Sequence, residues 1–151
     1  MAGMFEGVAA RTFAPLVLRA ALAAVFIYHG LEKIRPEAGF GWSWANEMPG
    51  APDVLIKAPP LQLLVAWGEL LGGVAVALGI LTRVAALGLI IIMCGAIFTY
   101  TGQHGFSAAG QSGYEYNFVL ILVCLALLLA GPGTFSLDRV VRVGSRGPAQ
   151  Y

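Results

Sequence analysis

The chain has 151 residues, of which 58% are hydrophobic and 11% are charged, and its formal net charge is +1. Soluble domains carry about 25% charged residues, so the charges are too few to cover a water-soluble globule. The near-neutral charge offers no basic patch for phosphates, which argues against a nucleic-acid-binding protein. We therefore predict a single membrane domain over residues 1–151, with the lipid bilayer as its main solvent.

The first long apolar run predicts a membrane-spanning helix over residues 14–35, since a span needs roughly 20 mostly apolar residues. Cleavage of this run as a signal peptide is the competing interpretation. Arg19 interrupts the run, and Gly-Leu-Glu-Lys at 30–33 stands where small residues would mark a cleavage site. We therefore expect the first helix to be retained.

Residues 36–59 form the first of two long loops outside the spans. They are rich in Pro and Gly, and they include Trp42 and Trp44. Tryptophan suits the lipid–water interface, where an aromatic ring with one polar atom is favoured. We expect a partly ordered segment over the mouth of the bundle, with a short interfacial helix around residues 43–48.

Three further spans are predicted, over residues 60–81, 83–101 and 115–131. Pro59 and Pro60 suit the first turn of a helix, and a tight turn at Thr82 and Arg83 makes the second and third spans antiparallel neighbours. The segments outside these spans are a second outer loop at 102–114 and a tail at 132–151, in which Ser136 is expected to cap a helical turn. The predicted fold is an all-α, integral membrane four-helix bundle with both termini on the same side.

The distribution of basic residues predicts the orientation of the bundle. Lys and Arg in short loops favour the cytoplasmic side. The end that holds the termini carries Arg11, Arg83, Arg139, Arg142 and Arg146. The basic residues of the opposite end are diluted by acidic ones. We expect a multi-pass protein of the inner (plasma) membrane, with cytoplasmic termini and both long loops outside.

One carboxylate, Glu69, lies near the middle of the second span. A charge there costs at least about 2.5 kcal/mol on insertion scales and marks a bundle interior or a functional site. Gly68 and Gly72 flank Glu69, and small residues at this spacing let membrane helices approach closely. Glu69 also lies about 13 Å below the outer end of its helix, at 1.5 Å per residue. It is therefore expected to form the floor of a polar cluster in the outer half of the bundle.

The candidate ligand-binding residues of this cluster are Arg19, His29, Lys33, Glu69, Tyr114, Tyr116 and Asn117. Glu69 and Glu115 are the candidate proton-handling groups. Arg19 is a candidate partner of Glu69, because its long side chain can reach across several ångströms. The alternative is a purely structural pair of Glu69 with Arg19 or Lys33, since buried pairs can specify packing without doing chemistry.

The histidines and cysteines do not predict a metal site or an evident cofactor. His29 and His104 are the two histidines, and the Gly-rich loop around His104 argues against a bis-His b-type haem. Cys94 and Cys124 lie in different spans without a CxxC or CxxCH motif. Thiolates are disfavoured in apolar surroundings, so we interpret them as structural cysteines rather than a redox pair. A quinone, bound through His29 or a tyrosine, stays open as a cofactor.

Four motifs in the same order and spacing resemble the DoxX family of small four-helix membrane proteins, over nearly the whole chain. They are Leu18-Arg19 with His29-Gly30-Leu31-x-Lys33, Gly68-Glu69-Leu-Leu-Gly72-Gly73 with Leu78-Gly79-Ile80-Leu81-Thr82-Arg83, Gly113-Tyr114-Glu115-Tyr116-Asn117, and Gly131-Pro132-Gly133-x-x-Ser136-Leu137-Asp138. The family includes polypeptides similar to the DoxD subunit of thiosulfate:quinone oxidoreductase. Other members are associated with membrane oxidoreductase complexes and thiol redox balance, so the resemblance implies the fold and the location more than a reaction.

Two functions remain open, and with them the question of whether the chain is an enzyme. In the first, it is a quinone-interacting or accessory subunit of a membrane oxidoreductase complex. His29 and Tyr116 would donate hydrogen bonds to the quinone, Glu69 or Glu115 would exchange protons, and other membrane or periplasmic redox proteins would supply electrons. In the second, it is a non-catalytic scaffold subunit without a ligand. The oligomeric state does not follow from the sequence.

Overall fold

The computed structural model describes residues 7, 12–107 and 113–139, and it confirms an all-α membrane bundle. The long helices are α2 (Ala14–Lys33), α4 (Pro59–Leu78), α5 (Thr82–Thr99) and α6 (Glu115–Ala130). The short helices are η2 (Pro36–Gly41), η3 (Trp44–Glu47), α3 (Asp53–Ile56) and η4 (Thr101–His104). No strand occurs among the described residues. Arg11, Arg142 and Arg146, which entered the orientation argument, lie outside them.

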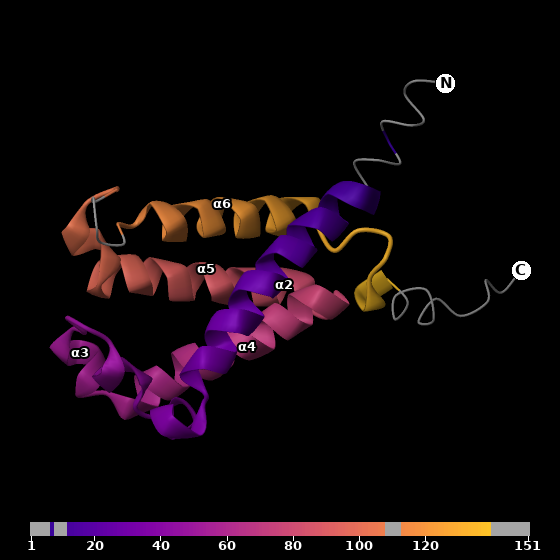
Figure 1. Cartoon of the computed structure of the whole chain (residues 1–151). Helices are drawn as coiled ribbons and strands as arrows, with labels where there is room; N and C mark the ends of the chain where they lie inside the picture. The colour runs from indigo at the N-terminus through magenta and orange to yellow at the C-terminus, as the bar shows by residue number, and fades with distance from the viewer. Residues whose placement is uncertain (1–6, 8–11, 108–112, 140–151) are drawn as a thin grey trace, which may run out of the picture.

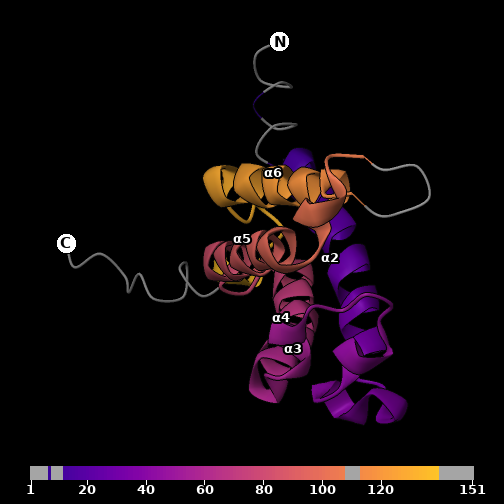
Figure 2. The ribbon, with the colours of Figure 1, turned by 90° about the vertical axis from the view of Figure 1, so that its left-hand side faces the viewer.

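The long helices form two pairs, in which α2 packs along α4 and α5 packs along α6. The pairs are inclined to each other and spread apart towards one end (Figures 1 and 2). We call this the loop end, because residues 34–58 and 100–107 lie there. At the other end, the tail end, the turn at 79–81 meets residues 131–139. The spreading leaves space between the pairs at the loop end.

The boundaries of the four helices lie within three residues of the predicted spans, but α6 is shorter than the others. In the described part of the chain, three helices are long and apolar enough to cross a membrane, and α6 is a shorter apolar helix of 16 residues. At 1.5 Å per residue it covers about 24 Å. Gly131 ends it with a φ of 79°, a conformation that no helix can continue. Its start is fixed by the Phe106 carbonyl, which accepts a hydrogen bond from the Glu115 amide.

Two glycines bring α2 and α4 into direct backbone contact. A Cβ atom added to Gly30 would lie 2.6 Å from the backbone nitrogen of Leu70. A Cβ atom on Gly73 would lie 3.0 Å from the backbone nitrogen of Ile27. Real Cβ atoms do not come as close as 2.6 Å, so this crossing requires glycine at position 30. At position 73 the contact would be tight, and the neighbouring backbone would have to shift by a few tenths of an ångström. Small residues have the same use in other membrane helix pairs.

The glycines that flank Glu69 contact a different helix. Added Cβ atoms on Gly68 and Gly72 would lie 2.8 and 2.9 Å from side-chain carbons of Ile92 and Leu89 on α5. The predicted close approach at Gly68-x-x-x-Gly72 is therefore confirmed, and α5 is the partner. Glu69, between them, points instead towards α2.

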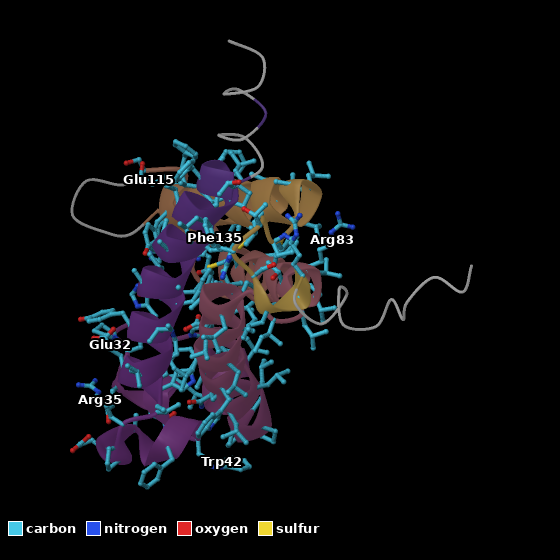
Figure 3. The ribbon with its side chains drawn as sticks, turned by 90° about the vertical axis from the view of Figure 1, so that its right-hand side faces the viewer. Glu32, Arg35, Trp42, Arg83, Glu115 and Phe135 are labelled. Atoms are coloured by element: carbon cyan, nitrogen blue, oxygen red, sulfur yellow. The ribbon has the colours of Figure 1, made fainter. Side chains whose placement is uncertain are left out.

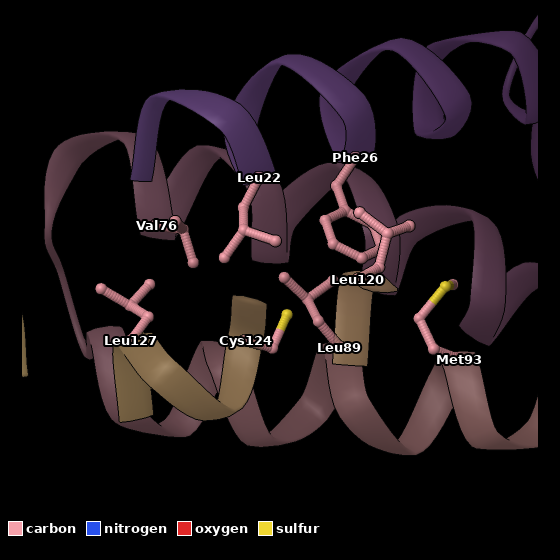
Figure 4. Close-up of a cluster of buried hydrophobic side chains, with 8 residues drawn as sticks. All are labelled: Leu22, Phe26, Val76, Leu89, Met93, Leu120, Cys124 and Leu127. Atoms are coloured by element: carbon pink, nitrogen blue, oxygen red, sulfur yellow. The ribbon is translucent and has the colours of Figure 1, made fainter. Parts of the chain in front are cut away.

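A cluster of buried apolar side chains joins the two helix pairs (Figure 4). Its members come from all four long helices and are Leu22, Phe26, Val76, Leu89, Met93, Leu120, Cys124 and Leu127. The outer faces of the same helices expose large apolar residues such as Val17, Leu71, Val84 and Leu129. These faces suit contact with lipid chains rather than water.

A buried arginine closes the tail end. The Arg19 guanidinium donates to the Val76 and Ala77 carbonyls of α4, at 2.8 and 2.7 Å. It also donates to the carbonyls of Pro132 and Phe135 in the segment after α6. The last carbonyls of a helix lack intrahelical donors and favour cationic partners. Arg19 is thus a structural bridge between the end of α4 and the tail.

A second tail-end contact fixes the start of α5. The Asp138 carboxylate accepts hydrogen bonds from the amides of Leu81 and Thr82, at 2.7 and 3.0 Å, and from the Thr82 hydroxyl. The expected helical turn does follow Ser136. However, the Ser136 hydroxyl donates to the Gly133 carbonyl instead of capping that turn. The capping group that the structure shows is Asp138, and the helix it caps is α5.

Candidate functional site

A cavity of about 450 Å³ occupies the space between the helix pairs at the loop end. All four long helices and the segment at 44–55 line it. Most of the lining is apolar, with Leu61, Leu64, Val65, Ile91, Ile92 and Ala96 among the wall residues. Ligand sites are typically concave, mostly apolar and furnished with a few convergent polar groups. The cavity therefore qualifies as the candidate site.

A buried ion pair forms one side of the cavity. The Lys33 ammonium, near the end of α2, lies 2.5 Å from the Glu69 carboxylate of α4. Glu69 is 4% exposed, and the ammonium also lies 5.2 Å from the ring centre of Trp44. Of the two partners predicted for Glu69, Lys33 is confirmed. Both side chains line the cavity, so the pair faces any ligand bound there.

His29 and Tyr116 face each other from α2 and α6. Their ring centres are 6.2 Å apart, and both side chains line the cavity. The His29 Nδ1 atom also lies 3.5 Å from the Glu32 carboxylate, and both of these side chains are about two-fifths exposed. His29 therefore connects the cavity with a carboxylate on the surface.

Asn117 and Met93 lie deeper between the pairs. The Asn117 side-chain amide donates to the Met93 sulfur at 3.4 Å, and both residues line the cavity. A thioether is a weak acceptor, so this amide loses little by turning to a stronger acceptor on a ligand.

The segment at 34–58 forms a fixed wall, because one glutamine of α4 holds it. The fully buried Gln62 side chain donates to the Leu55 carbonyl and accepts from the Ala45 amide, both at 2.9 Å. The indole of Trp44 donates to the Gln62 carbonyl at 2.9 Å. The predicted ordered segment is confirmed, and η3 lies within the predicted interfacial helix at 43–48. The 3.6-residue periodicity of α4 places Gln62 on the same face as Glu69, but no pattern in the sequence shows that it binds this loop.

A hydrogen bond joins that wall to the opposite helix pair. The Tyr100 hydroxyl, directly after α5, donates to the Pro49 carbonyl at 3.0 Å. Trp44, Met48 and Tyr100 all line the cavity. The segment at 34–58, which we call the covering segment, therefore covers the loop end of the cavity. The Tyr100 hydroxyl joins it to the end of α5.

Three predicted site residues lie outside the cavity. Arg19 uses its donors at the tail end, so its pairing with Glu69 was wrong. The sequence places Arg19 and Glu69 on inward faces, but they lie at different depths. Tyr114 packs edge-on against Phe106, with ring centres 5.3 Å apart. Glu115 accepts a hydrogen bond from Ser107 at 3.0 Å and points away from the bundle (Figure 3).

The remaining histidine and the cysteines also lie apart from the cavity lining. His104 packs against Tyr100, with ring centres 5.3 Å apart, and does not line the cavity. Both cysteines are free thiols, and Cys124 belongs to the apolar core. Within the described part of the chain, no group of three or more His, Cys, Asp or Glu could hold a metal ion.

Together, the fold and the cavity define a small integral membrane bundle with a buried polar pair in an otherwise apolar chamber. The family model of DoxX matches residues 14–102, more than half of the chain, and the protein belongs to the DoxX family. The matched part contains Lys33, Glu69, the covering segment and the whole α4–α5 contact. The cavity residues on α6 lie beyond it.

Three relatives extend this comparison. An uncharacterized protein of Haemophilus influenzae is 29% identical over 130 residues, which cover 84% of this chain and 82% of the relative. CatD of Bacillus subtilis, whose name marks it as a proposed oxidoreductase, is 28% identical over 87% of this chain and 89% of its own. The uncharacterized membrane protein Rv3486 of Mycobacterium tuberculosis is 36% identical over 54% of each chain. No solved structure matches the chain.

Proposed function

We propose that this protein binds a quinone in the loop-end cavity and acts as the quinone-binding subunit of a membrane oxidoreductase complex. The observation that carries the proposal is the composition of the cavity. Five polar residues predicted as ligand-binding, His29, Lys33, Glu69, Tyr116 and Asn117, meet in a chamber whose other walls are mostly apolar. A quinone has the matching division into a polar ring and an apolar chain. The name of the relative CatD supports the oxidoreductase part of this proposal.

The polar side chains have distinct roles in this proposal. His29 and Tyr116 donate hydrogen bonds to the carbonyl oxygens of the quinone ring. Glu69 and Lys33 exchange the protons that the ring takes up when it is reduced to the quinol. His29 and Glu32, 3.5 Å apart, connect these groups with the surface. The electrons come from a reduced partner protein of the complex.

Glu115 has no part in this scheme, because it does not line the cavity. Of the two candidate proton-handling groups, the proposal keeps Glu69. We also place the loop end on the periplasmic side and the termini in the cytoplasm, as the basic residues of the sequence indicate.

A scaffold function is the alternative, and one contact favours it. Lys33 bonds Glu69 and lies over the ring of Trp44, so it joins α2, α4 and the covering segment. Such an arrangement would also serve helix packing alone. The two functions differ in whether anything occupies the cavity.

The test is the quinone content of the protein purified in mild detergent. We expect the wild-type protein to retain quinone, or to bind added quinone, in near-stoichiometric amount. Glu69→Gln should lower quinone affinity about tenfold, which corresponds to about 1.4 kcal/mol. Glu115→Gln is the matched control, because it removes a carboxylate outside the cavity, and it should bind like the wild type.

A second variant keeps this test decisive if Glu69→Gln fails to fold. Lys33→Met combined with Glu69→Gln leaves no unpaired charge, and it should fold yet bind quinone weakly. If the wild type binds no quinone and the variants change thermal stability alone, the scaffold function is correct.

A further inference from the structure

The contact between α4 and α5 ends partway along the helices. Towards the tail end the two helices touch, where Gly72 meets Leu89 and Gly68 meets Ile92. These residues lie one above the other along the shared face. Further towards the loop end, Leu64 continues this face of α4. On α5, Gly95 lies at the edge of the contact, about 60° around the helix from Ile92 at 3.6 residues per turn, where an added Cβ atom meets nothing within 4 Å. These two residues line the cavity.

Residues at this part of the α4–α5 face belong to the cavity and to the outer surface at once. Leu64 is 67% exposed and Ile91 is 63% exposed, and Gly95 is also exposed. All three line the cavity. The cavity therefore opens sideways between α4 and α5, through a gap that we call the lateral portal, lined by Leu64, Ile91 and Gly95. In a membrane bundle this surface faces lipid chains.

The other features of the cavity give the lateral portal a direction. The covering segment closes the loop end, where the Tyr100 hydroxyl donates a hydrogen bond to the Pro49 carbonyl. His29 and Tyr116 belong to α2 and α6, and these helices lie across the bundle from the α4–α5 gap. His29 and Tyr116 are themselves partly exposed, but they furnish the α2–α6 side with polar groups, whereas the α4–α5 side is apolar. A polar head group bound at His29 and Tyr116 would therefore have its apolar atoms directed towards the lateral portal.

We infer that the lateral portal admits the ligand from the bilayer and holds its chain, so that the ligand is a quinone with a long isoprenoid tail. This inference rests on the proposed function and adds the tail, its path and its entrance. Leu64, Ile91 and Gly95 are apolar, and the hydroxyl of the nearby cavity residue Thr99 already donates to the Gly95 carbonyl at 2.8 Å. This lining suits a hydrocarbon chain and disfavours a soluble, chainless substrate. The isoprenoid chain of the quinone passes out between α4 and α5, while the quinone ring stays beside Lys33 and Glu69.

Two glycines on α5 provide a matched pair for the test. A Cβ atom added to Gly95 or to Gly88 meets no atom within 4 Å. Gly95 lines the cavity, whereas Gly88, about two turns away on the same helix, does not. A phenylalanine at Gly95 would fill the lateral portal, and a phenylalanine at Gly88 would extend into lipid.

The experiment measures binding of two quinones with the same ring, one with a long isoprenoid chain and one without, by quenching of tryptophan fluorescence. We expect the wild type to bind the long-chain quinone about tenfold more tightly. Gly95→Phe should abolish this preference and keep binding of the chainless quinone. Gly88→Phe should behave like the wild type. Ile91→Trp narrows the same gap from a neighbouring position and should repeat the effect of Gly95→Phe.

The outcomes separate the two proposals. If Gly95→Phe and Ile91→Trp keep the wild-type preference for the long-chain quinone, the lateral portal is overturned while the proposed function stands. The same loss in Gly88→Phe would also overturn it, because the effect would then be general to α5. If the wild type binds neither quinone, the proposed function fails and the lateral portal fails with it.

Discussion

Lys33 links three separate parts of the molecule through one ammonium group. It extends from the end of α2 to the Glu69 carboxylate of α4, at 2.5 Å, and lies over the ring of Trp44. Its side chain is 18% exposed and that of Glu69 is 5% exposed, so water screens the pair poorly. Removing one partner of such a pair leaves a buried charge without compensation. The pair is thus more sensitive to single changes than to the loss of both charges.

A double-mutant cycle tests this sensitivity. Lys33→Met and Glu69→Gln should each lower the free energy of unfolding by about 3 to 5 kcal/mol, because each strands a buried charge. The double variant should lose clearly less than the sum of the two single variants. Unfolding in mixed micelles, followed by circular dichroism, measures all four proteins.

The chain contains a matched control for this cycle. Lys57 and Asp53 also lie 2.5 Å apart, but their side chains are 74% and 78% exposed. Exposed pairs contribute little to stability. Lys57→Met should therefore leave the unfolding transition in place. Additive losses in the double variant Lys33→Met/Glu69→Gln would contradict the coupling.

At the scale of elements, the helices follow from the sequence, whereas several of their contacts do not. The apolar runs and the Pro and Gly boundaries predict all four long helices, since a bilayer requires long uninterrupted helices. The inward stripe of α4 was also predictable, because 3.6-residue periodicity places Gln62 and Glu69 on one face. Glu69 lines the cavity for this reason, together with four predicted ligand-binding residues of α2 and α6.

Depth and irregular backbone explain what sequence reasoning missed. Arg19 finds acceptors in carbonyls of the segment after α6, and no pattern in the sequence shows where those carbonyls point. Asp138 caps a helix that begins 56 residues earlier in the chain. Gln62 binds a loop whose path depends on η2, η3 and α3. Such contacts arise only when distant segments come together.

The α2–α4 crossing gives a prediction at the element scale. Gly30→Ala should lower the free energy of unfolding by about 1 to 3 kcal/mol, the usual cost of overpacking. The added carbon would meet the Leu70 backbone at 2.6 Å, so the helices must separate. Gly88→Ala adds the same carbon in open space and should be neutral or slightly stabilising, because alanine favours helix. Thermal unfolding in detergent compares the two variants, and equal melting temperatures would refute the role of Gly30.

At the scale of the whole molecule, the two ends of the bundle differ in packing. The tail end is closed by hydrogen bonds of Arg19 and Asp138 to backbone groups, and the helix pairs meet there. At the loop end the pairs spread apart, and the covering segment encloses the cavity. Cavities need rigid support to hold polar groups in place. The closed tail end provides that support for the polar groups of the cavity.

The direction of these ends in the membrane gives the last prediction. Basic residues, among them Arg83 and Arg139 of the described part, favour a cytoplasmic tail end. Asn46 and Arg139 are exposed at opposite ends of the bundle. We therefore expect Asn46→Cys to react with a membrane-impermeant maleimide in right-side-out vesicles. Arg139→Cys should react in inside-out vesicles.

The parent protein is the control for this labelling, since both native cysteines lie within helices and Cys124 is fully buried. Their positions predict a low background in both kinds of vesicle. The opposite labelling pattern would show that the bundle has the reverse orientation. The covering segment and the cavity would then lie in the half of the membrane nearest the cytoplasm. The reduced partner protein that the proposed function requires would then have to be a cytoplasmic protein, so this measurement also decides on which side of the membrane such a partner is to be sought.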